Sequence, residues 1–265
     1  MQYSADLSKI IDYARVNFAW EKVSFEGKYY YNREKFEREL SVTRFNMYQF
    51  VLYHKREPLY IPYIEKKLKA AWIPDDFKYL AIAESGLRNE SLSSVGAGGI
   101  WQFMPDTAKR FKLQINDYVD ERYHFELATD AAIQYFLKLY DDFHDWTLVA
   151  AAYNRGENGL RRALEDQKVD SYYDLYLNEE TTRYLFRIIA IKYLMENRLT
   201  VFDTRELWDV FAAPRTTLVK VTEIKDIKAW CQTNKYDYAT IRQLNQWILG
   251  NTLPKGEWSI KVLDL

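Results

Sequence analysis

Two carboxylates of this chain fall on otherwise apolar helical faces, where an acidic side chain could do chemistry. In segment 74–86 one helical face collects Phe77, Leu80, Ala81 and, at its next position, Glu84. Burial disfavours the charged form of a carboxyl and the negative end of a helix dipole acts in the same direction, so we expect a raised pKa for Glu84. Such a group can serve as a general acid. A structural glutamate paired with an arginine or lysine is the competing interpretation.

The second carboxylate is Glu180. It shares a helical face with Tyr184, Ile188 and Ile191. Structural pairing with Arg183 or Arg187 competes with a role in a functional site.

A tyrosine and an asparagine end another apolar helical pattern. Asp145 can cap its start, and the face that follows collects Trp146, Val149, Ala150 and Tyr153. Asn154 comes next, just before Gly156, so the pair ends its helix as Glu84 ends the earlier one. Tyr153 alone would be read as a core aromatic.

Glycines indicate which loops these helices lead into. The chain has only 9 glycines in 265 residues, yet two short stretches hold most of them: Gly86, Gly96, Gly98 and Gly99, then Gly156 and Gly159. Since a chain sparing with glycine places it where the backbone needs positive φ or close approach, both stretches are candidate site loops. Ordinary helix-ending turns are the alternative. For segment 74–86, Pro74 suits the first turn and Gly86 the C-terminal cap.

Composition excludes several classes of protein. Lys plus Arg number 37 and Asp plus Glu 38, a net charge of −1, so a nucleic-acid binder acting through bulk positive charge is excluded. The 48% hydrophobic and 28% charged residues are typical of a globular domain. The lone Cys231 excludes an internal disulfide. His54, His124 and His144 lack metal-ligand spacing, so we expect neither a metal nor a cofactor.

The apolar pattern predicts a mainly α protein with a small appended module. Helical spacing dominates from about residue 32 to residue 200, including an apolar stripe within 33–53 formed by Phe36, Leu40, Phe45, Tyr48 and Leu52. We expect Pro58 and Pro62 to interrupt the helix before a short one at about 63–72. After Pro214, strands at 218–221 and 258–262 flank two short helical patterns, a β-α-α-β order.

Three ordered stretches resemble the catalytic domain of the soluble-type (SLT) lytic transglycosylases, most closely the membrane-bound lytic murein transglycosylase D group. They are AIAESGLRNESLSSVGAGGIWQFMPDTAKRF at 81–111, VAAAYNRGENGL at 149–160 and EETTRYLF at 179–186. The resemblance implies a lysozyme-like domain at 63–213, a helical N-terminal extension at 1–62 packed on it, and the module at 214–265.

The resemblance also implies an activity. Such enzymes cleave the β-1,4 bond between N-acetylmuramic acid and N-acetylglucosamine in peptidoglycan without hydrolysis, leaving 1,6-anhydro ends. It assigns Glu84 as the only catalytic carboxylate, acting as acid and then as base. It assigns substrate-binding roles to Ser85, Ser93, Gln102, Met104, Tyr153, Asn154 and Glu180.

The tail resembles a LysM module, a β-α-α-β sugar-binding fold, through IRQLNQWILGNTLPKGEWSIKV. Asn245, Pro254 and Gly256 occupy the positions of its Leu-Asn and Pro-Gly elements. The Gly-Asp-Thr-Leu start common in LysM is absent, so the resemblance implies the fold but not glycan binding.

Three rival functions compete with the transglycosylase activity. A hydrolase resembling goose-type lysozyme would need an activated water, for which Asp117, Asp120 and Glu121 are conceivable suppliers. A non-catalytic glycan-binding envelope protein would use the aromatic-rich flanks and the tail. A cytoplasmic helical adaptor without a sugar partner is the blandest option.

The expected partners are peptidoglycan strands, with no nucleic acid, and the chain is expected to act as a monomer. No apolar run approaches the roughly 18 residues of a membrane helix. The start of the chain lacks an export-type run, which fits either a cytoplasmic protein or a trimmed one. For a peptidoglycan enzyme we expect the periplasm or cell envelope, with the export signal and any anchor upstream of this chain.

Overall fold

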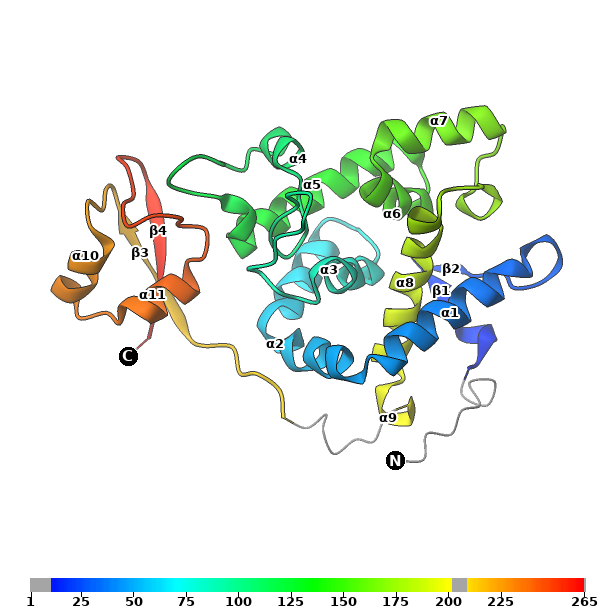
Figure 1. Ribbon diagram of the computed structural model, residues 1–265, viewed down its shortest axis with the longest axis horizontal. Coiled ribbons are helices and arrows are strands. Elements are labelled where there is room, and N and C mark those ends of the chain that lie inside the picture. Colours follow the sequence, from blue (N-terminus) through cyan, green and yellow to red (C-terminus); the bar gives the residue numbers. More distant parts are fainter. Residues whose placement is uncertain (1–10, 202–208, 265) are drawn as a thin grey trace. The chain divides into compact units, whose positions relative to one another are not determined.

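The computed structural model describes residues 11–201 and 209–264. It divides into two compact units: unit 1 comprises Met1–Gly86 and Tyr135–Phe211, and unit 2 comprises Leu87–Gln134 and Ala212–Leu265. The described part is mainly helical, as predicted (Figure 1). None of its helices is both long and apolar enough to cross a bilayer.

Unit 1 is built around one long helix, α8 (Glu179–Glu196), whose middle residues are almost all buried. Helices α1 (Tyr31–Phe45), α3 (Lys78–Ser85) and α6 (Trp146–Arg155) pack against it (Figure 1). The unit also contains α2 (Met47–Ala70), α7 (Glu157–Gln167) and α9 (Arg198–Val201), while α5 (Phe125–Phe143) runs from unit 2 into unit 1. Because α3, α6 and α8 share one core, the ends of these helices bring distant residues together.

A small hairpin fastens the N-terminal segment to this core. Strands β1 (Asn17–Phe18) and β2 (Glu21–Lys22) pair antiparallel. The Asp76 carboxylate accepts from the Ala19 backbone N–H and from Lys192 Nζ, both at 2.7 Å, and Lys192 also donates to Asn17. Asp76 therefore ties the hairpin to α8.

The predicted break at Pro58 and Pro62 is wrong, because α2 is one helix that runs through both prolines. A proline inside a helix removes a hydrogen bond and costs about 3 kcal/mol or more. Here one face of α2 buries Phe50, His54, Ile61, Ile64 and Leu68. Burying large apolar side chains contributes about 1.5–3 kcal/mol each, so the tertiary packing of this face outweighs the local cost.

The predicted stripe within 33–53 is half correct. Phe36 and Leu40 are buried on α1, but Phe45 and Tyr48 are 75% and 77% exposed. The chain leaves helical geometry at Asn46, between α1 and α2, so the two helices do not continue one face.

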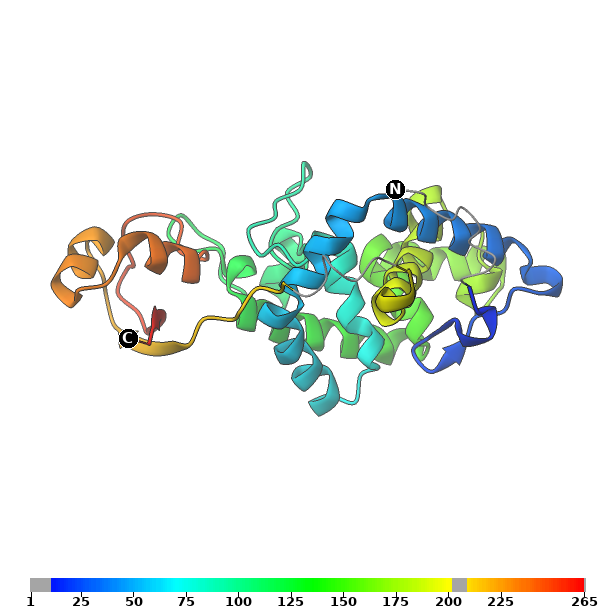
Figure 2. The same cartoon turned by 90° about the horizontal axis from the view of Figure 1, so that it is seen from below.

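Unit 2 combines the loop between α3 and α4 (Pro105–Arg110) that holds Gly96, Gly98 and Gly99, here called the glycine-rich loop, with the C-terminal module. The first half of α5 follows α4. The module contains β3 (Thr216–Val221), α10 (Ile227–Asn234), α11 (Tyr238–Leu244) and β4 (Trp258–Leu263), which Figure 2 shows grouped together in orange to red. Its strands pair antiparallel, with Val219 opposite Ile260. The predicted β-α-α-β order is confirmed.

Asn245 holds the module together. The residue is fully buried, and its amide donates to the carbonyls of Ile241 at 2.8 Å and Lys261 at 2.9 Å while accepting from the Lys261 N–H. Since a buried amide must satisfy its polar atoms, this side chain fixes the end of α11 against β4.

Candidate active site

Helix α3 presents Glu84 at its last turn. Gly86 ends the helix in the left-handed conformation at φ +62°, as predicted. A Cβ on Gly86 would come within 2.7 Å of the Gln49 and Tyr53 side chains, so the turn needs glycine for space as well as for φ. Arg56 donates to the Gly86 carbonyl at 2.8 Å, which satisfies a free end of the helix.

Glu84 is bonded to a tyrosine rather than to a cation. The Tyr184 hydroxyl, which lies on α8 and is buried, donates to Glu84 Oε1 at 2.5 Å. Among the described residues Glu84 makes no ion pair, so the interpretation of Glu84 as half of a structural salt bridge loses its support. The residue keeps part of its surface accessible to solvent.

The surroundings of Glu84 favour its protonated form. The pKa of its carboxyl is raised from 4.5 to about 7. Burial is the largest cause, as the position at the end of an apolar helical face predicted. The Tyr184 hydroxyl and the positive charge of Arg187 lower the pKa, and the negative charge of Glu180 raises it. A carboxyl with this pKa can donate a proton near neutral pH and accept it back.

The two arginines considered as partners for Glu180 bind another carboxylate. Arg183 Nε contacts buried Glu39 of α1 at 2.5 Å, and Arg187 Nε contacts the same carboxylate at 3.5 Å. Glu180 is exposed and forms no ion pair with either arginine. Glu39 therefore orients the arginines of α8, and Glu180 remains available at the first turn of the helix.

Tyr153 lies near the acid. Its ring packs on Tyr135 and Phe136, with centroids 5.4 and 5.2 Å apart. The pKa of Tyr153 is raised well above its usual range, first by burial and then by the charge of Glu84. Asp145 caps α6 as predicted, accepting from Thr147 N and Leu148 N, and so fixes the helix that delivers Tyr153.

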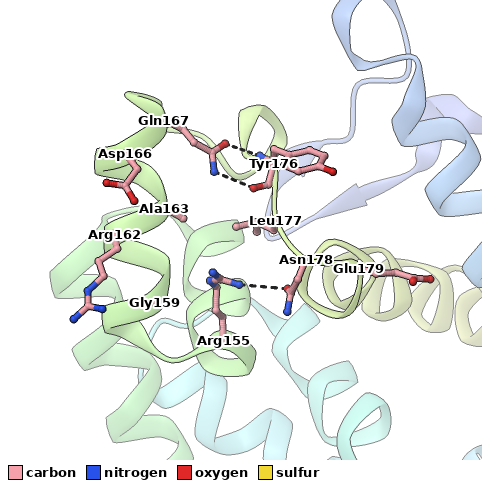
Figure 3. A pocket seen from close by; sticks show the side chains of 10 residues that line it. All are labelled: Arg155, Gly159, Arg162, Ala163, Asp166, Gln167, Tyr176, Leu177, Asn178 and Glu179. Atoms are coloured by element: carbon pink, nitrogen blue, oxygen red, sulfur yellow. Dashed lines mark hydrogen bonds between the residues drawn. The ribbon is translucent and has the colours of Figure 1, made fainter.

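Asn154 and Glu180 face the same cavity. It measures about 310 Å³ and is completed by Arg155, Gly159, Asn178 and Thr181. An adjoining cavity of about 550 Å³ shares Arg155, Gly159 and Asn178 and extends to Tyr176 (Figure 3). There the Gln167 amide bonds both backbone groups of Tyr176, at 2.7 and 2.9 Å, and Arg155 donates to Asn178 (Figure 3).

Ser85 is buried, and its hydroxyl donates to the Ala81 carbonyl at 3.1 Å within α3. Because the hydroxyl proton is used inside the helix, any contact of Ser85 with a ligand would be through its acceptor lone pairs.

Three further predicted residues lie in unit 2. The Ser93 hydroxyl accepts from the Ala97 N–H at 2.9 Å, and the Gln102 amide donates to the Gly99 and Ser91 carbonyls at 2.8 and 3.2 Å. Gln102 adopts φ +50°, which is rare for a residue with a side chain, and Met104 is 44% exposed. Ser93 and Gln102 thus shape the glycine-rich loop.

Sequence reasoning did not assign Tyr184 and Arg187 to the site. Tyr184 had been noted only as a member of the Glu180 face, and Arg187 only as a possible partner of Glu180. Their spacing could have indicated this role, because Tyr184 lies one helical turn and Arg187 two turns after Glu180 on the same helix. Within the described residues no cluster of three or more His, Cys, Asp or Glu side chains could hold a metal ion.

Residues 62–175 match the family model described as Transglycosylase SLT domain. The chain is 27% identical over 211 residues to membrane-bound lytic murein transglycosylase D of Escherichia coli strain K12, covering 75% of this chain and 44% of that protein. It is 32% identical over 115 residues to a putative tributyltin chloride resistance protein of Alteromonas sp. strain M-1, covering 43% and 55%. The chain therefore spans about half the length of these relatives.

Two solved structures are also similar. Lytic transglycosylase Slt of Pseudomonas aeruginosa, an inactive mutant, has 18% identity and a TM-score of 0.42, over 57% of this chain and 26% of that one. The 70 kDa soluble lytic transglycosylase of Escherichia coli has 24% identity and a TM-score of 0.44, over 59% and 28%.

Proposed function

We propose that this protein is a peptidoglycan lytic transglycosylase, which cleaves the β-1,4 bond between N-acetylmuramic acid and N-acetylglucosamine and leaves a 1,6-anhydro end. The observation that carries the proposal is Glu84, a carboxyl with a pKa of about 7 held by Tyr184. It lies inside the stretch that matches the transglycosylase SLT domain. The similarity to a lytic murein transglycosylase supports the same substrate.

In the proposed reaction Glu84 acts twice. Its proton goes to the glycosidic oxygen as the bond from that oxygen to C1 breaks, and the resulting carboxylate then takes the proton of the muramic acid C6 hydroxyl. The C6 oxygen attacks C1 and closes the anhydro ring. No water enters, and Glu84 ends protonated for the next cycle. A pKa near the working pH suits a group that must both donate and accept a proton.

The remaining predicted residues would bind the glycan. Tyr153 would hydrogen-bond near Glu84 and the substrate N-acetyl group, with Asn154 and Glu180 lining the adjacent cavity. Ser85, Ser93, Gln102 and Met104 are the other proposed substrate contacts. We propose that the enzyme works as a monomer in the periplasm or cell envelope, reached through an export signal or anchor upstream, and that the C-terminal module is LysM-like.

The hydrolase alternative finds less support. It needs a second carboxylate to activate water. Of the three carboxylates considered, Asp120 is buried in a pair with Arg122, and Glu121 accepts from the Gln114 N–H at 2.7 Å. Only Asp117 stays exposed and without such a partner.

Digestion of purified sacculi tests the proposal. The wild type, Glu84→Gln and a control, Glu165→Gln on the exposed face of α7, are compared by mass spectrometry of the soluble products. We expect products one water lighter than hydrolytic muropeptides from the wild type and the control, and none from Glu84→Gln. Reducing-end products would establish a hydrolase. Sacculus binding with no release by the wild type would establish a glycan-binding protein instead.

A further inference from the structure

The buried apolar core of the C-terminal module includes a side chain from outside the module, and a second, Tyr123, packs partly buried against it. Val119 is fully buried, and it packs in one cluster with module residues that include Ile224, Trp247 and Ile260. Val119 lies in the loop region of unit 2, nearly a hundred positions before β3 in the sequence. The module therefore completes its core with a residue of the loop region.

Backbone hydrogen bonds fix the segment on either side of Val119. The Asp120 N–H donates to the Trp247 carbonyl, and the Leu249 N–H donates to the Tyr118 carbonyl, both at 2.8 Å. They form a short antiparallel bridge between Val119 and Ile248. Paired backbone groups of this kind set a register, so the contact has one defined alignment.

Side chains extend the contact beyond the bridge. Asn89 donates to Gln246 Oε1 at 2.8 Å, and the rings of His124 and Trp247 lie 5.5 Å apart. Lys261 of β4 is ion-paired with Glu126. Apolar, backbone and charged contacts all join the same two segments of unit 2.

Asp120, whose N–H bonds to the module, also binds Arg122 through its carboxylate. Both are buried, and the guanidinium binds the carboxylate through Nη2 at 2.7 Å and Nε at 3.0 Å. The remaining terminal nitrogen of Arg122 donates to the carbonyls of Gly96 at 2.6 Å and Phe103 at 3.0 Å. Bidentate pairing fixes a guanidinium in direction as well as in place.

The glycine-rich loop is fitted closely around Arg122. A Cβ on Gly99 would lie 2.0 Å from the Arg122 carbonyl oxygen, so only glycine allows this approach. Gly99 in turn accepts the amide of Gln102 through its carbonyl at 2.8 Å. Contacts thus run without a gap from Trp247 of the module to Gln102, a proposed substrate contact.

We propose that the C-terminal module acts as a brace, which means that it keeps the glycine-rich loop in one conformation. Val119, Asp120 and Arg122 are positioning residues through which the module acts on the loop. The claim that this loop binds glycan rests on the proposed function. The claim that the module stabilises the loop does not depend on that function. A tethered glycan-binding module raises the affinity only for long polymers. A brace affects every substrate, including the shortest.

Hydrogen exchange of the full-length protein tests the brace without any substrate. The reporters are three hydrogen-bonded loop amides, those of Gly98, Gly99 and Phe103. In Val119→Ala, which removes part of the shared core, we expect these amides to exchange about tenfold faster while those of α8 are unchanged. The control is Lys228→Ala on the exposed face of α10, where the Lys228 ammonium lies over the Tyr238 ring within the module.

A second, milder variant distinguishes a specific effect on the loop from a general loss of stability. Gln246→Ala removes the hydrogen bond with Asn89, and we expect a smaller acceleration of the same three amides. Unchanged loop amides in Val119→Ala would overturn the brace. Equal acceleration in α8 would overturn it as well, because the hold would then not be specific to the loop.

Substrate length separates the brace from a glycan-binding role. For Val119→Ala we expect kcat/KM to fall by a similar factor, about tenfold, on a short soluble muropeptide tetrasaccharide and on sacculi. A loss confined to sacculi would overturn the brace in favour of glycan binding by the module. If the wild type cleaves neither substrate, the proposed function fails, and the exchange experiment still decides the brace.

Discussion

The Tyr184 hydroxyl donates a 2.5 Å hydrogen bond to Glu84 Oε1 across 100 positions of sequence. The bond stabilises the charged form of the carboxyl, whereas burial stabilises the neutral form. The pKa of about 7 is the balance of these two effects. Tyr184 also limits the orientations of Glu84, because the tyrosine is itself buried in the packing of α8.

Removing this donor should shift the pH dependence of activity. In Tyr184→Phe the pKa of Glu84 should rise, because the lost bond favoured the carboxylate. The alkaline limb of kcat/KM, which reports loss of the acidic proton, should then move upward by roughly one pH unit. The measurement is a pH profile of the initial rate on soluble glycan.

Tyr172→Phe is the matched control for this change. Tyr172 is equally buried, and its hydroxyl donates to the Thr181 and Thr182 carbonyls rather than to Glu84. Its removal should leave the alkaline limb in place. An alkaline limb that also stays in place in Tyr184→Phe would show that this hydroxyl does not set the pKa of the acid.

Glu84→Gln should stabilise the fold at alkaline pH. The pKa of Glu84 is higher in the folded protein than its ordinary value of 4.5, so the folded state holds the proton more tightly. The contribution of this carboxyl to stability is therefore full below about pH 4.5 and is lost as the pH rises through about 7. Glutamine carries no such charge, so we expect the variant to be about 2 kcal/mol more stable than the wild type at pH 8.

Urea unfolding at pH 5 and pH 8 checks this expectation. The difference between variant and wild type should be small at pH 5 and grow by pH 8. The same difference at both values would mean that Glu84 is not desolvated in the folded protein.

Local patterns were sufficient to predict the helix, the position of Glu84 in its last turn and the raised pKa of that carboxyl. The apolar face, Pro74 and Gly86 lie within thirteen consecutive residues, and each acts on its immediate neighbours. Tyr184 could not be assigned in this way, because its contact with Glu84 exists only once α3 packs on α8. Local patterns also predicted the order of elements in the C-terminal module. The packing of Val119 into the core of that module could not be predicted in this way, because it joins segments far apart in the sequence.

The two wrong predictions have the same origin. The break at Pro58 and Pro62 followed from a local rule, and the buried face of α2 overrides it. The stripe through Phe45 and Tyr48 assumed one continuous helix, whereas the chain turns at Asn46. Sequence periodicity describes a face only as far as its helix extends.

Glu39→Gln should destabilise unit 1. The Glu39 carboxylate is only 1% exposed and binds both Arg183 and Arg187. The arginines left behind are 27% and 36% exposed, so water partly solvates their charges, and we expect the free energy of unfolding to fall by about 1–2 kcal/mol. The control is Glu179→Gln, since that side chain is 67% exposed and its ion pairs should contribute less than about 0.5 kcal/mol. Similar losses in both variants, measured by urea unfolding, would contradict a special role for Glu39.

Alanine substitutions at two glycines of the same loop should distinguish the cost of backbone strain from the cost of steric overlap. Gly96 and Gly99 both adopt positive φ, at +89° and +80°, but a Cβ on Gly96 would meet nothing within 4 Å, whereas one on Gly99 would overlap the Arg122 carbonyl. Gly96→Ala should therefore cost about 1–2 kcal/mol of unfolding free energy through strain alone. Gly99→Ala should cost at least about 2 kcal/mol more, because the Arg122 backbone must move.

The same two variants should differ in function. Displacing Arg122 disturbs the loop that carries Gln102, so kcat/KM on soluble glycan should fall at least about tenfold in Gly99→Ala and much less in Gly96→Ala. Both quantities are measured on the full chain, by urea unfolding and by initial rates. Equal losses in the two alanine variants would mean that the close approach to Arg122 does not determine the shape of the loop.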